Sequence, residues 1–297
     1  QLIWSREEDT QHDFYRPMNV ALLRAGLDKN KAVISLRIQS AGQAIGPHFM
    51  HRHFPVMSDS DSPDKATAEG LCDIPYGFGN QKMSHVESPM GVPVGFWRSV
   101  GHSHNAFFSE CFVDELAEAS GMDALAFRRE WLAEAPRHLK ALNLAATKAG
   151  WGDPMPAGRA RGLALHHSFG SIVAQVAEVS LENGVPRVHR VVCAMDCGTV
   201  VNPGIIAQQV ESSVVFALSA ALYGKIDIVG GVVQQSSFTN YPLLQLAQAP
   251  VVETHLIDSE RDPTGAGEPA VPPLAPAVAN ALFALTGKRL RSLPLLV

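Results

Sequence analysis

The sequence has few cysteines, and their spacing is not that of metal ligands. The 297 residues include four cysteines, none of which belongs to a C-x-x-C pair. Tetrahedral zinc sites and iron–sulfur clusters are typically built from such closely spaced thiols. The sequence therefore predicts neither site in this chain, and a chain of this length does not depend on a disulfide scaffold. The four residues are Cys72, Cys111, Cys193 and Cys197.

A basic block and a long apolar run are also missing. The formal net charge is −5, and the 24 lysines and arginines are scattered. A nucleic-acid-binding surface needs clustered basic residues, so we expect no nucleic-acid partner. Glycine, proline or polar residues interrupt each apolar run before it reaches the roughly 20 residues that a membrane-spanning helix needs. We therefore expect no transmembrane segment.

What remains is the composition of a globular protein, with 46% hydrophobic and 18% charged residues. This length suits one large domain or two ordinary ones. The chain starts at Gln1 without a signal-like segment, so we expect it to be part of a longer polypeptide. We expect residues 1–297 to form one region, for which a division into two lobes, 1–155 and 156–297, is an option.

The N-terminal third has strand patterns and one long stretch without periodicity. The segments "QLIWSREED" and "AVISLRIQS" are expected to be strands, and the polar turn "DKNK" precedes the second. Residues 41–95 show no clear period and contain the linker-like "SDSDSPD". Because irregular stretches of this length are commonly functional, we expect this one to help shape a substrate pocket.

Three helical patterns follow the segment "WRSVGHSHN". The first is expected to be capped by Asn105 and to end at Gly121. Asp123 predicts the start of a second helix, which ends before Pro136. A third helix is expected to stop at Gly150.

The C-terminal half mixes strand and helix patterns without a regular βαβ rhythm. Asn183-Gly184 predicts a tight hairpin turn between two strands. Asn202 and Pro203 predict the start of a long apolar helix. The mixture predicts an α+β fold of mixed sheets packed with helices. The expected strands are 162–170, 171–182, 187–196 and two near 225–236 and 250–258, and a final helix is expected over 275–286.

A single acid, Glu268, stands in "TGAGEPAVPP", between Gly267 and Pro269. A solvated turn is the simplest interpretation, because glycine and proline are frequent in turns. A partly desolvated carboxylate at this place would instead suit a general base. The segment lacks the spacing of a dinucleotide-binding site, and the chain has no G-x-S-x-G hydrolase motif. The residues alone leave the turn and the base as open alternatives.

Two further polar side chains have a structural and a functional interpretation. Arg98 precedes Gly101 and the start of a helix, where exposed N–H groups suit an anion. Gln209 stands in an otherwise apolar helix, where its amide can bind a buried polar ligand. A surface arginine fits the first equally well, and a solvated stripe is the simpler interpretation of the second.

A metal-dependent hydrolase would use the histidines of "HFMHRHF", which are His48, His51 and His53. Two histidine ligands on a helix need i, i+4 spacing, and this segment shows no helical pattern. We therefore interpret them as ordinary loop histidines.

Five segments of the chain occur in the same order in one protein family. On these segments the chain resembles the C-terminal part of the molybdopterin-binding large subunit of the xanthine oxidase/aldehyde oxidase family, and most closely its isoquinoline 1-oxidoreductase β-subunit branch. The resemblance spans essentially the whole chain. It implies that the upstream half of the subunit is not part of this sequence. The segments are "SREEDTQHDFYRP", "PVGFWRSVGHSHNAFFSECFVDELA", "HHSFGSIVAQVAEV", "RVVCAMDCGTVVNP" and "PTGAGEPAVPPLAPAVANALFALTGKR".

The resemblance implies roles for the polar residues. Glu268 matches the family's catalytic glutamate, which acts as general base on a molybdenum-bound hydroxide whose oxygen comes from water. Gln209 matches a glutamine that binds the pterin, although Ser212 and Ser213 follow it where the family commonly has glycines. No residue is implied to ligate the metal. The residues implied to contact the cofactor are Arg98, Val100, Gly101, Gln209, Gly265 and Gly267.

The same resemblance implies a cofactor and partners. The cofactor is molybdenum with molybdopterin, expected in its cytosine dinucleotide form, and the substrate is an N-heteroaromatic compound or an aldehyde. Electrons are expected to leave through 2Fe–2S clusters on a small partner subunit, because this chain has no cysteine cluster to hold them. The isolated fragment is expected to be inactive, and the compartment stays open between bacterial cytoplasm and periplasm.

Two other functions remain as alternatives. A non-catalytic scaffold or interaction domain would keep the fold without the cofactor, and the serines at 212 and 213 favour it. A metal-dependent hydrolase using His48, His51 and His53 is the weaker alternative.

Overall fold

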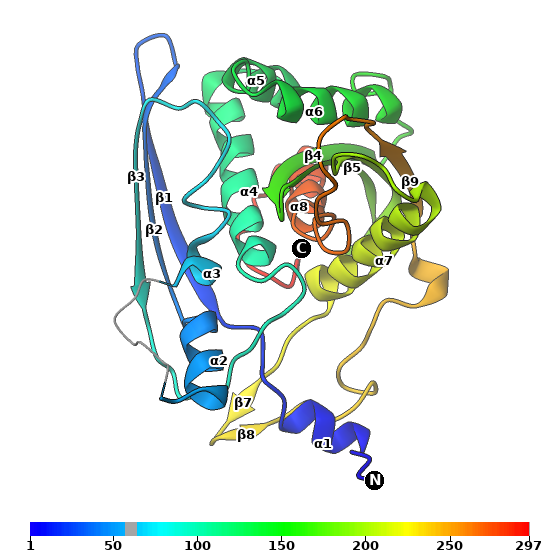
Figure 1. Cartoon of the computed structure of the whole chain (residues 1–297). Helices are drawn as coiled ribbons and strands as arrows, with labels where there is room; N and C mark the ends of the chain where they lie inside the picture. The colour runs from blue at the N-terminus through cyan, green and yellow to red at the C-terminus, as the bar shows by residue number, and fades with distance from the viewer. Residues whose placement is uncertain (57–63, 297) are drawn as a thin grey trace.

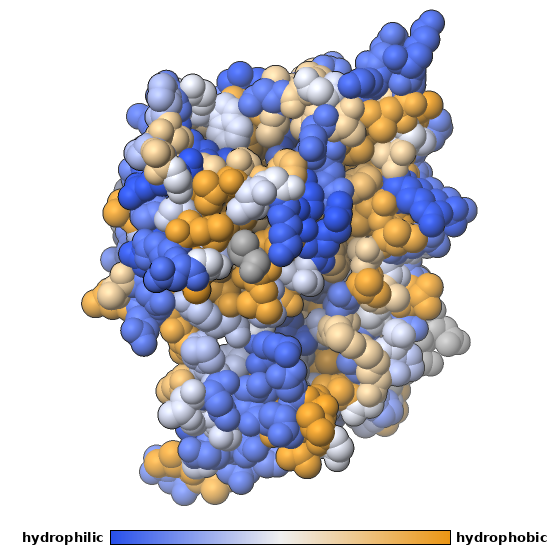
Figure 2. Space-filling view, turned by 180° about the vertical axis from the view of Figure 1, so that it is seen from behind, coloured by the Kyte–Doolittle hydropathy of each residue, from blue (hydrophilic) through white to orange (hydrophobic). Residues whose placement is uncertain are grey.

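The computed structural model describes residues 1–56 and 64–296 and has an α+β fold, as the sequence predicts. A three-stranded sheet and a four-stranded sheet lie on opposite sides of the long helix α4 (Figure 1). The opposite face of the molecule mixes apolar and polar side chains, as protein surfaces generally do (Figure 2). The polar segment expected as a linker lies outside the described residues, apart from Asp64.

The four-stranded sheet forms the centre of the core. β4 (Arg159–Ser168), β5 (Ser171–Glu182) and β6 (Val185–Asp196) are antiparallel neighbours, and β9 (Val251–Leu256) pairs in parallel with β6. Asn183-Gly184 makes the turn between β5 and β6 with positive φ at both residues, 54° and 81°. A type I′ hairpin turn has this geometry. The strands predicted over 162–170, 171–182, 187–196 and near 250–258 are confirmed, as is the turn.

Helices cover both faces of β5, which explains its nearly continuous apolar run. Ile172 and Val176 pack in one cluster with α6 (Pro136–Ala149), whereas Ala177 packs with α8 (Leu274–Thr286). All three strand residues are at most 1% exposed. A strand that is buried on both faces is apolar at consecutive positions, so its sequence does not alternate.

The smaller sheet consists of β1 (Asn19–Leu27), β2 (Val33–Gly42) and β3 (Asn80–Glu87). β1 and β2 are antiparallel, and β3 pairs in parallel with β2. In the turn between β1 and β2, Asp28 accepts hydrogen bonds from the backbone N–H groups of two following residues at 2.8 and 3.0 Å. The predicted strand over "AVISLRIQS" and the polar turn before it are confirmed.

The three helices predicted in the middle of the chain are present. α4 (His102–Ser120) ends at Gly121 and α6 ends at Gly150, both in the left-handed conformation that favours glycine. The Asp123 carboxylate accepts two backbone N–H groups at the start of α5 (Ala124–Trp131), each at 3.0 Å. Local capping signals therefore located these helices correctly.

Asn105 does not cap α4, contrary to the prediction. The helix begins at His102, and Asn105 lies in its first turn. The Asn105 amide donates instead to the carbonyl oxygens of Thr67 and Glu69, each at 2.8 Å. The side chain therefore holds a distant loop against α4, and a contact of that kind leaves no local pattern.

The C-terminal helices begin and end as predicted. Asn202 caps α7 (Pro203–Leu222) by accepting a backbone N–H at 3.1 Å, and α8 is closed by Gly287. Among the residues described, α7 is long and apolar enough to cross a membrane by length and composition, contrary to our expectation for every apolar run. Its glutamines and serines interrupt the apolar run, but the mean hydropathy of the helix stays high enough for a membrane span. About half of it (44%) is buried inside the protein, where it packs against β6, β9 and α8.

The N-terminal segment is a helix and not the expected strand. Ser5 accepts a hydrogen bond from the N–H of Glu8 at 3.2 Å and caps α1 (Arg6–Gln11). Acidic side chains fill the first turn of this helix, where the helix dipole favours them. The Ser5 cap and the acidic first turn therefore favour a helix more strongly than the short apolar stretch before them favours a strand.

Residues 41–95 are also more regular than predicted. They contain α2 (Ile45–His53), the short α3 (Lys65–Ala68) and β3. The Asp64 carboxylate accepts the N–H groups of Ile45 and Gly46 at 2.7 and 3.2 Å and so caps α2 from 18 residues further along the chain. The strand expected near 225–236 is only a small hairpin. Its strands are β7 (Ile228–Val229) and β8 (Val232–Val233), and a 3-10 turn, η1 (Leu246–Gln248), follows.

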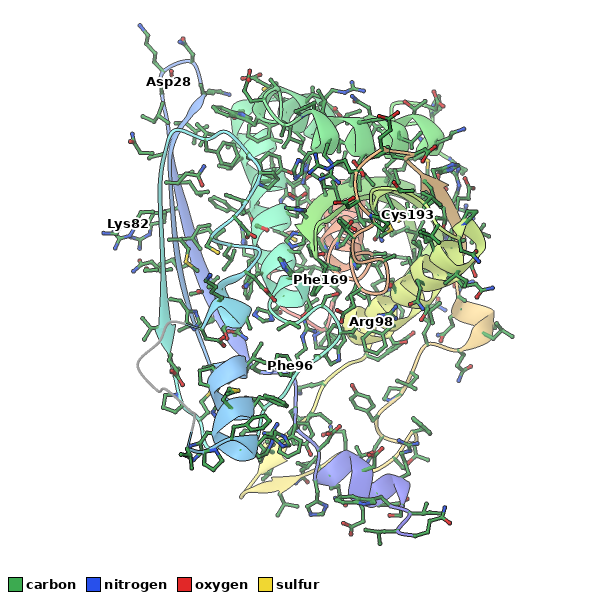
Figure 3. The ribbon with its side chains drawn as sticks, viewed as in Figure 1. Asp28, Lys82, Phe96, Arg98, Phe169 and Cys193 are labelled. Atoms are coloured by element: carbon green, nitrogen blue, oxygen red, sulfur yellow. The ribbon has the colours of Figure 1, made fainter. Side chains whose placement is uncertain are left out.

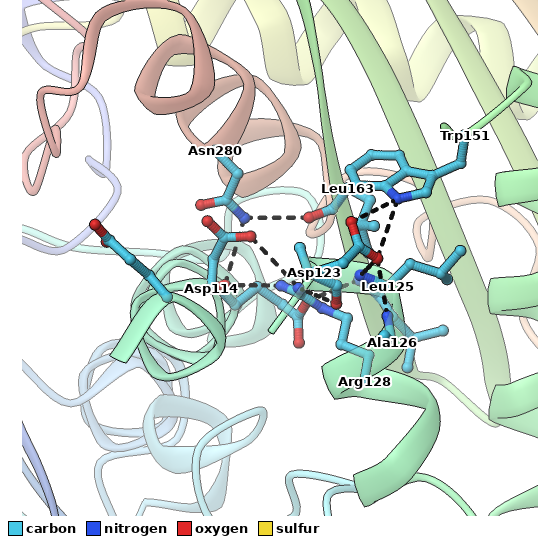
Figure 4. A network of polar contacts seen from close by, with 12 residues as sticks. Asp114, Asp123, Leu125, Ala126, Arg128, Trp151, Leu163 and Asn280 are labelled. Atoms are coloured by element: carbon cyan, nitrogen blue, oxygen red, sulfur yellow. Dashed lines mark hydrogen bonds and ion pairs between the residues drawn. The ribbon is translucent and has the colours of Figure 1, made fainter. Parts of the chain in front are cut away.

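A buried ionic network ties α4, α5 and β4 together (Figure 4). Arg128 has no exposed surface and donates from Nε to the Glu110 carboxylate at 3.1 Å, with Asp114 at 3.5 Å. Glu110 also accepts the Tyr76 hydroxyl at 2.6 Å and the Leu165 N–H at 2.9 Å. A buried charge is tolerated when it is paired and hydrogen-bonded in this way.

We expect Arg128→Met to lower the free energy of unfolding by about 3–5 kcal/mol, because Glu110 and Asp114 would stay buried without their cation. Urea denaturation of the variant and the parent measures the difference. Arg129→Met is the matched control, since Arg129 is exposed on the same helix, and it should change the value by no more than about 0.5 kcal/mol. Equal losses in both variants would contradict the role of the network.

Candidate functional site

Three distant segments meet around the Arg98 guanidinium. Its Nε donates to the carbonyl oxygen of Gly267 at 3.1 Å, and Nη2 donates to the same oxygen and, at 3.0 Å, to the Gln209 side-chain oxygen. Nη1 donates to the Ser212 hydroxyl at 3.0 Å. The loop before α4, helix α7 and the loop before α8 are therefore joined by one side chain. Figure 3 shows Arg98 beside α7 and near the N-terminal end of α4.

Glu268 is held by the residue that follows Arg98. The Ser99 N–H donates to Glu268 Oε1 at 3.0 Å, and the Ser99 hydroxyl donates to the Glu268 carbonyl oxygen at 2.7 Å. Glu268 itself is half-buried, whereas Ser99 is fully buried. The carboxylate is therefore fixed beside the Arg98 turn and does not lie in a solvated turn.

The turn itself has an uncommon backbone. Ser99 and Val100 both have positive φ, 73° and 48°, which is costly for a β-branched residue such as Val100. A side chain at Gly101 would lie 2.0 Å from the carbonyl oxygen of Ala66, so only glycine fits there. The conformation directs the N–H groups of Ser99 and Gly101 toward carboxylates, Glu268 for the first and Glu69 for the second, at 3.0 and 3.2 Å.

The two glycines before Glu268 differ in their surroundings. A side chain at Gly265 would lie 2.7 Å from Phe169 Cβ, so packing within the protein already requires a glycine there. A side chain at Gly267 would meet nothing closer than the Gln209 Oε1 atom at 3.8 Å. Protein packing alone therefore leaves room for a side chain at Gly267.

Ser212 and Ser213 are part of this arrangement. Ser212 accepts from Arg98, and the buried Ser213 hydroxyl donates to the Gly267 carbonyl oxygen at 3.4 Å. The two serines therefore strengthen the contact between α7 and the Gly267 loop. In this chain they take the positions that the family resemblance assigns to glycines.

The site fits a ligand that is rich in oxygen. Because Arg98 donates to the Gln209 oxygen, the Gln209 amide is oriented with its NH2 group free to donate to a ligand. This NH2 group can donate to a phosphate or oxo group, and the guanidinium adds a positive charge that suits such a ligand. The N–H groups of Ser99, Val100 and Gly101 are already hydrogen-bonded within the protein. The open space above Gly267 lets a bulky group approach the backbone there. The residues present are therefore compatible with a molybdopterin cofactor.

A second acid and its histidine partner lie near the turn, and no sequence pattern pointed to them. Glu69 lies in the stretch without periodicity, and burial raises its pKa to about 7. His102 Nε2 lies 3.6 Å from Glu69 Oε2, and His102 Nδ1 shares a hydrogen bond of 2.9 Å with His166 Nε2. Burial lowers the pKa of His102 to about 4, so at neutral pH its contact with Glu69 is not an ion pair.

The histidines considered for a metal site lie in α2, which corrects the expectation that their segment is a loop. The apolar side of that helix packs Phe49 against Phe96, with ring centroids 5.3 Å apart. Within residues 1–56 and 64–296, no group of three or more His, Cys, Asp or Glu side chains has the arrangement of a metal site.

Two comparisons with known proteins agree with this geometry. Residues 111–250 match the family model described as a molybdopterin cofactor-binding domain. The chain is 29% identical over 302 residues to isoquinoline 1-oxidoreductase subunit beta of Brevundimonas diminuta, with 99% of this chain and 38% of that protein covered. The chain is thus similar to molybdopterin-binding oxidoreductase subunits of the xanthine oxidase family.

Solved structures of similar fold belong to molybdenum hydroxylase large subunits. Quinoline 2-oxidoreductase from Pseudomonas putida 86 matches with a TM-score of 0.81 and 10% identity over 98% of this chain and 62% of that chain. Aldehyde oxidoreductase from Desulfovibrio gigas matches with a TM-score of 0.75 and 12% identity over 97% of this chain and 49% of that chain. At these identities the likeness concerns the fold alone. The α+β fold and the resemblance to molybdopterin-binding subunits are thus confirmed for a chain that spans less than half of its curated relative.

We expect the buried His102 to make the protein less stable in acid. Its pKa of about 4 in the folded state lies below the ordinary value of 6.5, so the unfolded chain binds a proton that the folded chain does not. Stability is therefore lost as pH falls from about 6.5 toward 4, by on the order of 3 kcal/mol. Urea denaturation at several pH values should give a smaller loss for His102→Asn than for the parent. An identical pH dependence in both would contradict the assignment.

Proposed function

We propose that this chain is the C-terminal cofactor-binding region of a molybdenum hydroxylase, which oxidises an N-heteroaromatic compound or an aldehyde with oxygen from water. The observation that carries the proposal is the hydrogen-bonded convergence of Arg98, Gln209 and Glu268 from three separate segments. The match of residues 111–250 to a molybdopterin cofactor-binding domain supports the cofactor class. Similarity to an isoquinoline 1-oxidoreductase subunit and to an aldehyde oxidoreductase supports the two substrate classes.

The cofactor in this proposal is molybdenum with molybdopterin in its cytosine dinucleotide form. When bound, it supplies the redox chemistry and accepts the electrons of the substrate. Arg98 and the turn residues Val100 and Gly101 line its binding place, and the free NH2 group of Gln209 donates to it. Gly267 gives it access to the backbone, whereas Gly265 serves the packing of Phe169. None of these residues is a proposed metal ligand.

Glu268 is the proposed general base. The Ser99 N–H holds one carboxylate oxygen, which leaves the other free to remove a proton from the water-derived oxygen that attacks the substrate. A base must be oriented toward its proton within hydrogen-bond reach, and the two Ser99 contacts restrict the side chain and its backbone together. Arg98 adds a positive charge nearby, and the Glu268 charge in turn opposes the lowering of the Arg98 pKa by burial.

The proposed partners follow from what the chain does not supply. The upstream half of the same subunit completes the cofactor site, since the chain spans 38% of its curated relative. A small iron–sulfur subunit carries the electrons away through 2Fe–2S clusters. We therefore expect the two proposed lobes, 1–155 and 156–297, to work only within the complete enzyme.

A scaffold without cofactor is the second candidate, and the serines at 212 and 213 are the observation that favours it. Their hydrogen bonds to Arg98 and Gly267 are equally compatible with a working site, because they brace it without filling the space above Gly267. Molybdenum and pterin that co-purify with the full-length protein support the enzyme. Their reproducible absence under molybdate supply supports the scaffold.

We expect Glu268→Gln in the complete enzyme to lower kcat at least 100-fold and to leave the molybdenum content unchanged. The amide keeps the shape and the Ser99 contact but does not accept a proton. Steady-state turnover and metal analysis measure the two quantities. Glu211→Gln is the matched control, because Glu211 is an exposed acid on α7 and should leave kcat unaltered. Retained turnover in Glu268→Gln would disprove the assignment.

We expect Gly267→Ala to fold normally and to hold the cofactor roughly tenfold more weakly or worse. No protein atom lies closer than 3.8 Å to the added methyl group, so only a bound cofactor would collide with it. Thermal unfolding of the cofactor-free chain and the molybdenum content of the complete enzyme test the two halves. Gly204→Ala, in the exposed first turn of α7, is the control for both. Full molybdenum content in Gly267→Ala would exclude a close approach of the cofactor.

A further inference from the structure

Two carboxylates share the turn that follows Arg98. The Ser99 N–H holds Glu268, and the Gly101 N–H, two residues later, holds Glu69 Oε1 at 3.2 Å. Glu69 comes from the segment between α3 and β3, so the two carboxylates reach the turn from separate segments of the chain. The two acids thus lie on one short stretch of backbone that is fixed by its own uncommon conformation.

The position of Glu69 is set by several contacts. Its carbonyl oxygen accepts the Asn105 amide at 2.8 Å, and its carboxylate faces His102 Nε2 at 3.6 Å. His102 is in turn fixed by its hydrogen bond to the buried His166. The Glu69 side chain keeps 27% of its surface exposed, so protons can reach it from solvent. This combination of a fixed position and solvent access suits a group that exchanges protons.

The surroundings of Glu69 favour its neutral form. Burial is the main cause that raises its pKa to about 7, and the negative charges of Asp73, Asp64 and Glu268 raise it further. The Gly101 N–H opposes this shift, and the facing His102 is neutral at this pH. At neutral pH Glu69 therefore exists in both protonation states, which a group needs in order to accept and release a proton in each turnover.

The proposed reaction releases more protons than one base can take. Hydroxylation with water converts R–H and H2O into R–OH, two protons and two electrons; the electrons pass to the cofactor and then to the iron–sulfur subunit. Glu268 accepts one proton, and the other needs a second acceptor. We propose that Glu69 is this second proton-accepting residue, placed beside Glu268 by the turn that both carboxylates share. The inference rests on the proposed function of Glu268.

The coupling between the two acids supports this role. When Glu268 gains a proton it loses its negative charge, and the ionised form of Glu69 becomes more favourable. Protonation of one carboxylate therefore prepares the other to accept the next proton. The Glu268 charge is thus one of the influences on the pKa of Glu69.

We expect Glu69→Gln in the complete enzyme to lower kcat at least tenfold at full molybdenum content. In the parent enzyme kcat should rise with pH through an apparent pKa near 7, as Glu69 becomes able to accept a proton, and this rise should be missing in Glu69→Gln. Glu69→Asp should restore it. Asp73→Asn, which removes a neighbouring charge, should move the rise to lower pH and keep kcat. An unchanged kcat and pH profile in Glu69→Gln would overturn the inference.

Infrared difference spectroscopy gives a readout that does not depend on turnover. A protonated carboxyl band should titrate near pH 7, disappear in Glu69→Gln and move to lower pH in Glu268→Gln, where the neighbouring charge is gone. A band that ignores Glu268→Gln would overturn the coupling. Different outcomes would contradict the role of Glu268 as general base and the role of Glu69 as second proton acceptor. Turnover that survives Glu268→Gln removes the general base, whereas loss of turnover in Glu268→Gln with a normal Glu69→Gln enzyme removes only the role of Glu69.

Discussion

The arrangement of the site depends on one side chain, the half-buried Arg98. Its planar guanidinium donates to the Gly267 carbonyl, the Gln209 amide and the Ser212 hydroxyl, and each acceptor lies more than 100 residues away in the chain. A rigid fork with five N–H groups fixes several acceptors at once, which a lysine ammonium on a flexible stem does not. Burial lowers the pKa of Arg98, and the nearby Glu268 opposes that shift. The Arg98 cation therefore joins the segments of the site and places a positive charge near Glu268.

The turn after Arg98 positions two carboxylates through its backbone N–H groups. Positive φ at Ser99 and Val100 is unfavourable in isolation and persists only because the surrounding contacts impose it. The conformation presents the Ser99 and Gly101 N–H groups to Glu268 and Glu69. A turn without positive φ at Ser99 and Val100 would not direct these two N–H groups toward the carboxylates. The uncommon backbone of the turn and the positions of the two carboxylates thus depend on each other.

Elements with local signals were predicted well. Asp123, Asn202 and Asn183-Gly184 define a cap or a turn through atoms within three residues, so their sequence context is sufficient. Prediction failed where the stabilising contact comes from elsewhere. Helix α2 is capped by Asp64 from 18 residues further along, and Asn105 binds a loop that precedes it by 36 residues or more. The helix α1 is an exception, because its Ser5 cap and acidic first turn were visible in the sequence.

The sequence by itself determined the α+β class, most of the helices and strands and, through resemblance to a known family, the choice of Glu268, Arg98 and Gln209 as candidates. Each of these follows from periodicity, from short capping patterns or from ordered segments of residues. Only the tertiary structure decided that Arg98 binds Gln209, that Ser212 and Ser213 brace the loop, and that Glu69 shares the turn with Glu268. The physical reason is that a hydrogen bond between residues 32 to 169 positions apart leaves no pattern in the sequence around either partner.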